Sequence, residues 1–298
     1  MKTVKNLTIA SVLLLAALPV CASITGNTYF TDVVGGSPIA EAYALSKDAF
    51  SSHSFADPDA AAGEYNDEMG AESTGQQLGA EYTYGWYDAN GSDGTVHSIG
   101  VPYKHKFTPR VSGSIKARFL YSDFADMNVT LKGYGLTLGV PYGVYIKEDG
   151  TDYRWTLTPS VGLGIRTSDY LRGAFLMSPG LSSNYLYKIS DNLILNVGNS
   201  VTYHFTFKWD DYAEPTNDQV VFANGVQAIV PVDRWVFSGY YIFNYLTKGN
   251  LDSNKYHTMG VSGGYRISKK ISLRLNYYYE KGKDWAGHNI ALSSAWDF

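Results

Sequence analysis

The last ten residues, NIALSSAWDF at positions 289 to 298, alternate between an apolar and a polar face. The residues of the apolar face are Ile290, Leu292, Trp296 and Phe298. The residues of the other face include Asn289, Ser293 and Asp297. Because successive side chains of a strand point to opposite sides, this spacing predicts a β-strand with two different environments.

The same alternation extends back to Gln77, in about twelve segments of roughly ten residues that end at Gly, Asp, Asn, Ser or Pro. It is clearest from Leu193 to Phe207. From Val129 to Ile146 the phase is uncertain. The weakest strand prediction runs from Leu171 to Ile189, across a break at Pro179-Gly180.

The connections between these segments differ in length. The short turns are 108–110, 190–192, 232–234 and 268–270. The longer ones are 88–94, 122–128, 208–218, 246–255 and 281–287. Twelve strands would place all four short turns at the end of the sheet where the last strand finishes. In outer-membrane barrels short turns face the periplasm, so both termini are expected there.

Composition favours strands in lipid. The chain has 25 Tyr, 6 Trp and 30 Gly, and 45% of its residues are hydrophobic. Beyond residue 22 no run approaches the roughly 18 apolar residues of a membrane-spanning helix. Since hydrocarbon satisfies no free backbone group, a spanning sheet must close. The predicted fold is all-β, a transmembrane antiparallel barrel of about 12 strands at residues 76–298. Extraction without detergent would instead indicate a soluble β-sandwich.

The amino terminus reads as a signal peptide at residues 1–22, with Lys2 and Lys5, an apolar run and Val20-Cys21-Ala22. A lipoprotein signal ending at Cys21 is the alternative, although Pro19 and Val20 are poor residues for it. Residues 23–75 lack sustained alternation. We expect either a short lumen helix beginning near Ser37-Pro38 or a disordered lead-in.

Basic residues concentrate on the face opposite the aromatic one. The predicted lumen-lining residues are Lys104, Lys106, Lys116, Arg118, Arg154, Arg166, His204, Lys208, Arg266 and Arg274. The acidic residues of that face are Glu81, Glu280 and Asp297. The lumen is therefore expected to be net positive, although the chain has 24 Lys and Arg against 28 Asp and Glu.

Two interpretations of the lumen stay open. Basic residues along a water-filled passage would give a pore that prefers small anionic solutes. Alternatively, these residues pair across a filled lumen, which is common in small barrels and is the interpretation we favour.

Enzymatic chemistry is not expected. Ser182-Ser183-Asn184 resembles the Ser-Asn pair of barrel phospholipases but lacks a preceding His. Asp210-Asp211 with His257 could correspond to the carboxylate and imidazole groups of a barrel protease, although loop carboxylates are usually solvated. The six His residues lack ligand spacing, and the single Cys leaves with the signal. We expect no cofactor, no metal and no nucleic-acid partner.

The chain resembles solitary autotransporter-like outer-membrane barrels, which have a translocator-type barrel without a passenger. The resemblance covers residues 76–298. It rests on the strand number, the terminal Phe298, and the passage from Thr158-Pro159-Ser160-Val161-Gly162 to Ser183-Asn184-Tyr185. It implies an amino-terminal segment entering a porin-like pore in a Gram-negative outer membrane, and no catalytic residues. The last strand also resembles the signal that the barrel-assembly machinery recognises.

Overall fold

The computed structural model describes eleven stretches of the chain, and every strand belongs to one antiparallel sheet. The described residues are 76–89, 92–108, 111–124, 129–146, 153–168, 174–190, 192–208, 219–246, 255–268, 271–283 and 285–297. The strands are β1 (Gln76–Ala89), β2 (Ser92–Lys106), β3 (Ser112–Phe124), β4 (Val129–Gly139), β5 (Tyr142–Ile146), β6 (Tyr153–Ser168), β7 (Ala174–Ser190), β8 (Leu193–Lys208), β9 (Gln219–Val232), β10 (Trp235–Leu246), β11 (Lys255–Arg266), β12 (Ile271–Lys281) and β13 (Trp285–Asp297). The predicted signal peptide and the segment 23–75 lie outside these stretches.

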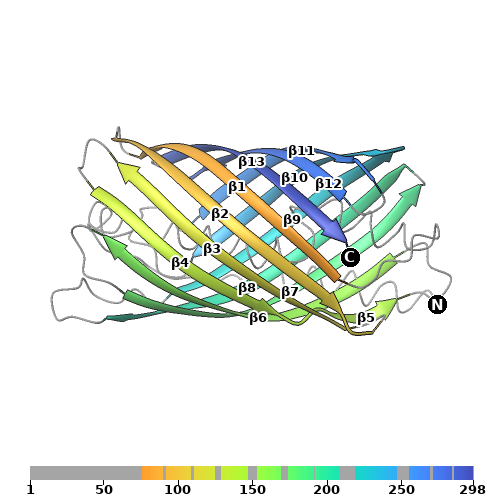
Figure 1. The fold of residues 1–298 in the computed structure, drawn as a ribbon, viewed down its shortest axis with the longest axis horizontal. Coiled ribbons are helices and arrows are strands. Elements are labelled where there is room, and N and C mark those ends of the chain that lie inside the picture. The colour runs from red at the N-terminus through yellow and green to blue at the C-terminus, as the bar shows by residue number, and fades with distance from the viewer. Residues whose placement is uncertain are drawn as a thin grey trace.

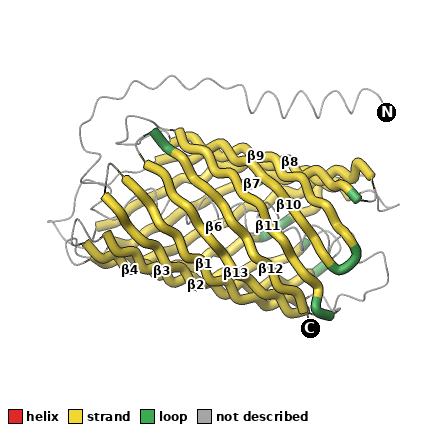
Figure 2. Tube along the Cα trace, turned by 90° about the horizontal axis from the view of Figure 1, so that it is seen from above, coloured by secondary structure: helices red, strands yellow, loops and turns green. Residues whose placement is uncertain are grey.

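The sheet closes on itself. Apart from β4 and β5, strands that follow each other in sequence pair with each other; β1 also pairs with β13, and β4 pairs with β6. The strands run obliquely along the barrel, and the strands of the far wall cross behind those of the near wall (Figures 1 and 2). The predicted closed antiparallel barrel is confirmed.

Strands β4 and β5 occupy a single position in the barrel. Gly139 of β4 pairs with Ser160 of β6, and Tyr142 of β5 pairs with Leu157, so the register continues across Pro141. A proline donates no ladder hydrogen bond, and here it interrupts the strand without ending it. The thirteen segments therefore form twelve barrel strands, as the sequence predicted.

The two uncertain regions of the sequence are thereby resolved. On β4 the outward residues are Tyr134, Leu136 and Leu138, and glycines and Thr137 occupy the inward positions. Strand β7 runs through Pro179-Gly180 and pairs on both sides of it with β8. Two predicted long connections were wrong: 88–94 and 281–287 are short, because Ala89 still pairs with Ser92 and Lys281 with Ala286. Only Asn90-Gly91 lie between β1 and β2. Asn-Gly is a strong hairpin signal.

All four predicted short turns lie at the end of the barrel where β1 begins and β13 finishes. We call this the turn end, and the opposite end the loop end. At the turn end β9 and β10 are joined by Asp233-Arg234 alone, since Val232 pairs with Trp235. Asp233 has a φ of 53°. Such tight turns need positive φ, which Asp tolerates better than most residues.

We predict that Asp233→Val destabilises the barrel by about 1–2 kcal/mol, because a β-branched side chain clashes with the backbone in this conformation. Asp233→Gly should be neutral or slightly stabilising. Urea unfolding in detergent micelles, followed by tryptophan fluorescence, measures both. Equal stability of the Val and Gly variants would contradict the strained turn.

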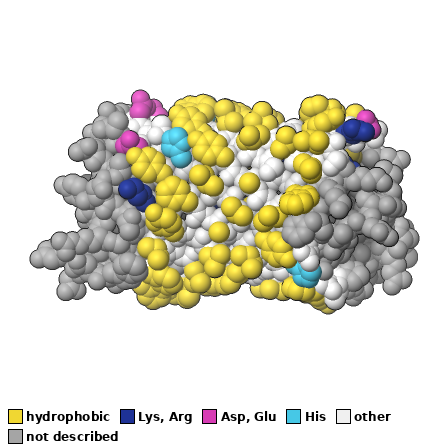
Figure 3. All heavy atoms as spheres, in the orientation of Figure 1, with side chains coloured by type: hydrophobic (Ala, Val, Ile, Leu, Met, Phe, Trp, Pro, Cys, Tyr) yellow, Lys and Arg dark blue, Asp and Glu magenta, His cyan; other side chains and the backbone are white. Residues whose placement is uncertain are grey.

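The barrel has an apolar outer face. The outward side chains predicted from the sequence are exposed, among them Tyr82 at 44% and Leu292 at 55%. On the face shown in Figure 3, hydrophobic side chains spread across the middle of the barrel, and the visible Lys, Arg, Asp and Glu lie near its two ends. The inward positions are instead rich in buried Ser, Thr, Asn and Gln.

Candidate functional site

The interior of the barrel is the candidate site. Five of the predicted basic residues have described side chains, and all five occupy inward positions: Lys104, Lys116, Arg118, Arg266 and Arg274. The side chains of Lys116 and Arg274 are buried, with 7% and 9% exposure for the residues. Lys106, Arg154, Arg166 and His204 occupy strand positions of the same inward parity, but their side chains lie outside the described part, as does that of Lys208.

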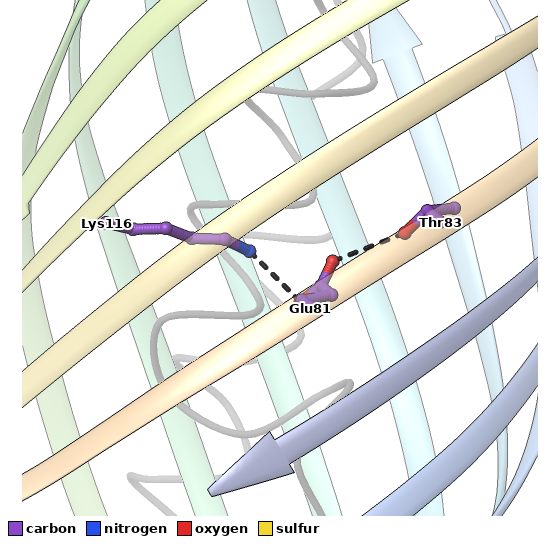
Figure 4. A network of polar contacts seen from close by, with 3 residues as sticks. All are labelled: Glu81, Thr83 and Lys116. Atoms are coloured by element: carbon purple, nitrogen blue, oxygen red, sulfur yellow. Dashed lines mark hydrogen bonds and ion pairs between the residues drawn. The ribbon is translucent and has the colours of Figure 1, made fainter.

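Lys116 of β3 forms an ion pair with Glu81 of β1, with 3.3 Å between Nζ and Oε2. Strand β2 lies between them and contributes Gly100, whose missing side chain leaves room: an added Cβ would lie 3.1 Å from Lys116 Cε. Thr83 donates a 3.4 Å hydrogen bond to the other carboxylate oxygen of Glu81 (Figure 4). The pair therefore joins three strands of one wall.

A second carboxylate, Glu280 of β12, is completely buried. The Tyr87 hydroxyl lies 3.0 Å from Glu280 Oε2 and 2.9 Å from Asn289 Oδ1, and Thr258 donates to Glu280 Oε1 at 3.3 Å. The Tyr87 ring lies over Gly287 on β13, where a Cβ would overlap it. Tyr87 thus links β1, β12 and β13 from inside.

Amide and hydroxyl side chains form a further chain across β8 to β11. Asn196 donates to Gln227 at 3.3 Å, Gln227 donates to Ser238 at 3.2 Å, and the hydroxyls of Ser238 and Ser262 lie 2.9 Å apart. All four residues are buried. Each hydrogen bond joins two neighbouring strands, so the series of hydrogen bonds holds these strands in register.

The wall formed by β6, β7 and β8 has a different character. Four of its described inward side chains, Thr158, Ser182, Asn184 and Thr202, are small and neutral and only 0–4% exposed. Their buried oxygen and nitrogen atoms have no hydrogen-bond partner within the described part of the chain. By strand order this hydroxyl wall lies opposite β12, β13 and β1, which carry Arg274, Glu280 and Glu81. The described charges of Arg274, Glu280 and Glu81 therefore lie across the lumen from the hydroxyl wall.

Sequence reasoning missed the inward tyrosines. Tyr87, Tyr240 and Tyr278 have inward parity, and Tyr278 is 1% exposed, whereas the sequence had assigned aromatic residues to the outer face. A usable signal was present. A glycine on the neighbouring strand faces each of two rings: Gly287 pairs with Tyr87, and Gly260 with Tyr240.

The hydrolase candidates are not brought together. Ser183 faces outward, and its hydroxyl oxygen accepts a 2.9 Å hydrogen bond from the Trp155 indole. His257 also faces outward, with Nδ1 2.6 Å from the Tyr241 hydroxyl. Asp210-Asp211 lie outside the described residues. In the described ranges no group of three His, Cys, Asp or Glu could hold a metal ion, and no helix could cross a membrane.

The residues of the predicted assembly signal occupy β13. Ile290, Leu292 and Trp296 lie on the outer face and are 42%, 55% and 52% exposed, and Phe298 lies outside the described stretch. Their recognition by the assembly machinery stays a prediction.

Comparison with solved structures places this fold among known barrels. The translocator domain of the autotransporter NalP from Neisseria meningitidis has a TM-score of 0.59 at 14% identity, over 82% of this chain and 98% of that chain. The β domain of the Bordetella autotransporter BrkA has a TM-score of 0.56 at 10% identity, over 75% and 100%. An outer-membrane channel from Pseudomonas putida F1 has a TM-score of 0.57 at 13% identity, over 75% and 96%.

No protein-family model matches the sequence, and no curated protein matches it. At these low identities the structural similarity concerns the fold. The chain has a closed barrel of the autotransporter-translocator type, which confirms the predicted resemblance, and this fold matches that of outer-membrane proteins.

Proposed function

We propose that this chain is an integral outer-membrane β-barrel with a largely filled lumen, which acts structurally or as a narrow, partly plugged pore. The observation that carries the proposal is the burial of the hydroxyl wall. In a wide aqueous channel, side chains such as Thr158 and Ser182 would be wetted, whereas here they are 0% and 2% exposed. Small barrels are commonly filled by side chains in this way.

Membrane insertion is supported by the outer face. Val261 at 59% and Leu275 at 56% exposure are two of the many large apolar side chains exposed on this face, and their contact with water would cost free energy. We place the turn end, where β1 begins and β13 finishes, in the periplasm, because short turns face that side in outer-membrane barrels. Barrel-assembly machinery and membrane lipid are the expected partners.

The plug is proposed to be the segment 23–75. Buried polar groups without a partner cost free energy, so the unpartnered atoms of Asn184 and Thr202 favour an occupant that supplies hydrogen bonds. The segment 23–75 has about fifty residues, which is enough for one pass through a lumen.

The test is a planar-bilayer recording of two chains, one beginning at residue 23 and one at residue 76. We expect the longer chain to be mostly closed and the shorter one to show larger, more frequent steps. Both should show the same heat-modifiable gel mobility, which controls for misfolding. Identical traces would remove the plug, and large stable conductance of the longer chain would overturn the filled lumen.

A pore with anion preference is the second candidate. It is supported by the inward charges with described side chains, which are five basic residues against Glu81 and Glu280. Fixed positive charge along a narrow passage favours anions. In the same recordings, a reversal potential that indicates cation preference would exclude this candidate.

A non-enzymatic role is the simplest assignment. The similar structures named above are translocator domains and a channel. In addition, Ser183 and His257, one from each hydrolase candidate, face outward, whereas Ser182 and Asn184 face the lumen.

A further inference from the structure

One side-chain arrangement occurs three times on the outer face near the loop end. In each, a Tyr hydroxyl lies close to Nδ1 of a His on the neighbouring strand: Tyr82 and His97 at 2.9 Å, Tyr241 and His257 at 2.6 Å, Tyr277 and His288 at 2.7 Å. Each His pairs in register with the aromatic residue two positions after its Tyr, namely Tyr84, Phe243 and Tyr279. The arrangement is a repeated feature of this rim.

In the Tyr contact either the hydroxyl or the ring nitrogen can be the hydrogen-bond donor. When the hydroxyl donates to Nδ1, the proton of the neutral ring lies on Nε2. Ring packing also restrains these imidazoles: Trp86 stacks on His288 with 5.3 Å between centroids and 13° between planes. With the Tyr hydroxyl as donor, each ring presents its Nε2–H as a restrained hydrogen-bond donor.

Among the described residues of this rim, one lysine lies between two of these histidines. Lys281 of β12 is exposed, points outward and pairs in register with His257 of β11. On its other side it pairs with Ala286 of β13, two residues before His288. Lys281 therefore lies between the two histidines on three adjacent strands, within the spacing at which cross-strand and diagonal neighbours interact.

Further basic residues lie on one side of the cluster of Lys281, His257 and His288, and acidic residues lie on the other side. Lys255 is outward and exposed two residues before His257, and Lys283 follows β12. The nearest described outward acid is Asp88 of β1, the strand on the far side of β13 from Lys281. Asp88 pairs with Ala286 of β13 and with Asp93 of β2. His97 lies on that acidic side, because β2 carries Asp93 and β3 carries Asp123.

The cluster lies at the edge of the apolar surface. The next outward residues toward the barrel middle are Met259 on β11, Leu275 beyond two tyrosines on β12, and Ile290 on β13, all at least 42% exposed. Aromatic side chains mark the membrane interface in such barrels. A Lys between two His at this depth meets lipid headgroups rather than acyl chains.

We propose that the outer face of β11, β12 and β13 at the loop end binds the phosphomonoester headgroup of a membrane lipid, through Lys281, His257 and His288. The inference rests on the membrane insertion proposed above. A phosphomonoester carries up to two negative charges and several acceptor oxygens, which suits one ammonium flanked by two N–H donors.

The test is native mass spectrometry of the detergent-solubilised full chain with added phosphatidic acid, phosphatidylglycerol or phosphatidylcholine of equal acyl length. The wild type should retain phosphatidic acid most strongly. Lys281→Gln should weaken its retention about five-fold, since a basic residue near an anionic membrane contributes on the order of 1 kcal/mol. Adding His257→Gln and His288→Gln should weaken it further.

His97→Gln is the matched control, because it removes the same Tyr–His pair where no lysine lies between histidines, and it should leave retention unchanged. Equal retention of the three lipids, or an equal loss with His97→Gln, would overturn the proposal. A chain that stays soluble and folded without detergent would instead refute membrane insertion. Failure of the lipid site can therefore be distinguished from failure of the proposed function.

Discussion

Gly287→Ala is expected to destabilise the barrel by about 2–4 kcal/mol. The added Cβ would overlap the Tyr87 ring, so the ring must move. Movement would break the contacts of the Tyr87 hydroxyl with buried Glu280 and Asn289. Overpacking typically costs about 1–3 kcal/mol, and a hydrogen bond to a charged group contributes about 1.5–3 kcal/mol. Urea unfolding in micelles measures the change.

Gly263→Ala is the control for this prediction. Gly263 faces outward on β11, and a Cβ there would meet the Phe237 ring at 3.6 Å, an ordinary contact. Removing a strand glycine should stabilise the barrel by up to about 1 kcal/mol through the unfolded state. Opposite signs for the two variants are the expected result. If Gly287→Ala also stabilises, the Tyr87 ring does not hold the strands together.

The outer face could be predicted from sequence because it obeys a simple physical rule. Lipid-facing positions must be apolar on every strand, so alternation appears wherever the opposite face is polar, as in β8 and β13. The same rule gave the inward parity of Lys116 and Arg274. Whether a residue faces inward or outward can be assigned from the pattern of its own strand, without knowing which strands lie beside it.

The interior could not be predicted in the same way because it obeys no single rule. On β4 the inward positions are mostly glycine, so the polar half of the pattern is missing and the phase was uncertain. Inside the barrel an aromatic ring is tolerated when a glycine faces it, as at Tyr87 and Tyr240. Such pairs depend on the register between strands distant in sequence, which one strand's pattern does not contain.

The candidate site was therefore predicted as a set of residues but not as an arrangement. Lys116 and Glu81 both appeared on the predicted inner face, yet their pairing across β2 requires Gly100 to lie between them. The position of the hydroxyl wall opposite β12, β13 and β1 likewise follows from the closure of the sheet.

Lys116→Met is expected to destabilise the barrel by about 2–4 kcal/mol. It removes the ammonium group 3.3 Å from a carboxylate whose side chain is only 17% exposed. Breaking a buried ion pair by removing one partner costs about 3–5 kcal/mol, and the partial exposure of Glu81 lowers this figure. Lys132→Met, at an exposed outward lysine of β4, should change stability by about 0.5 kcal/mol or less.

The double variant Glu81→Gln/Lys116→Met separates the pair from its surroundings. If the charges stabilise each other, removing both should cost less than the sum of the single changes, with a coupling of about 1–3 kcal/mol. Additive costs would mean that each residue acts through its other contacts, such as that of Glu81 with Thr83. Because the pair spans three strands beside the proposed passage, a strong coupling would also favour the filled lumen: charges that neutralise each other across the wall are not available to attract a permeating anion.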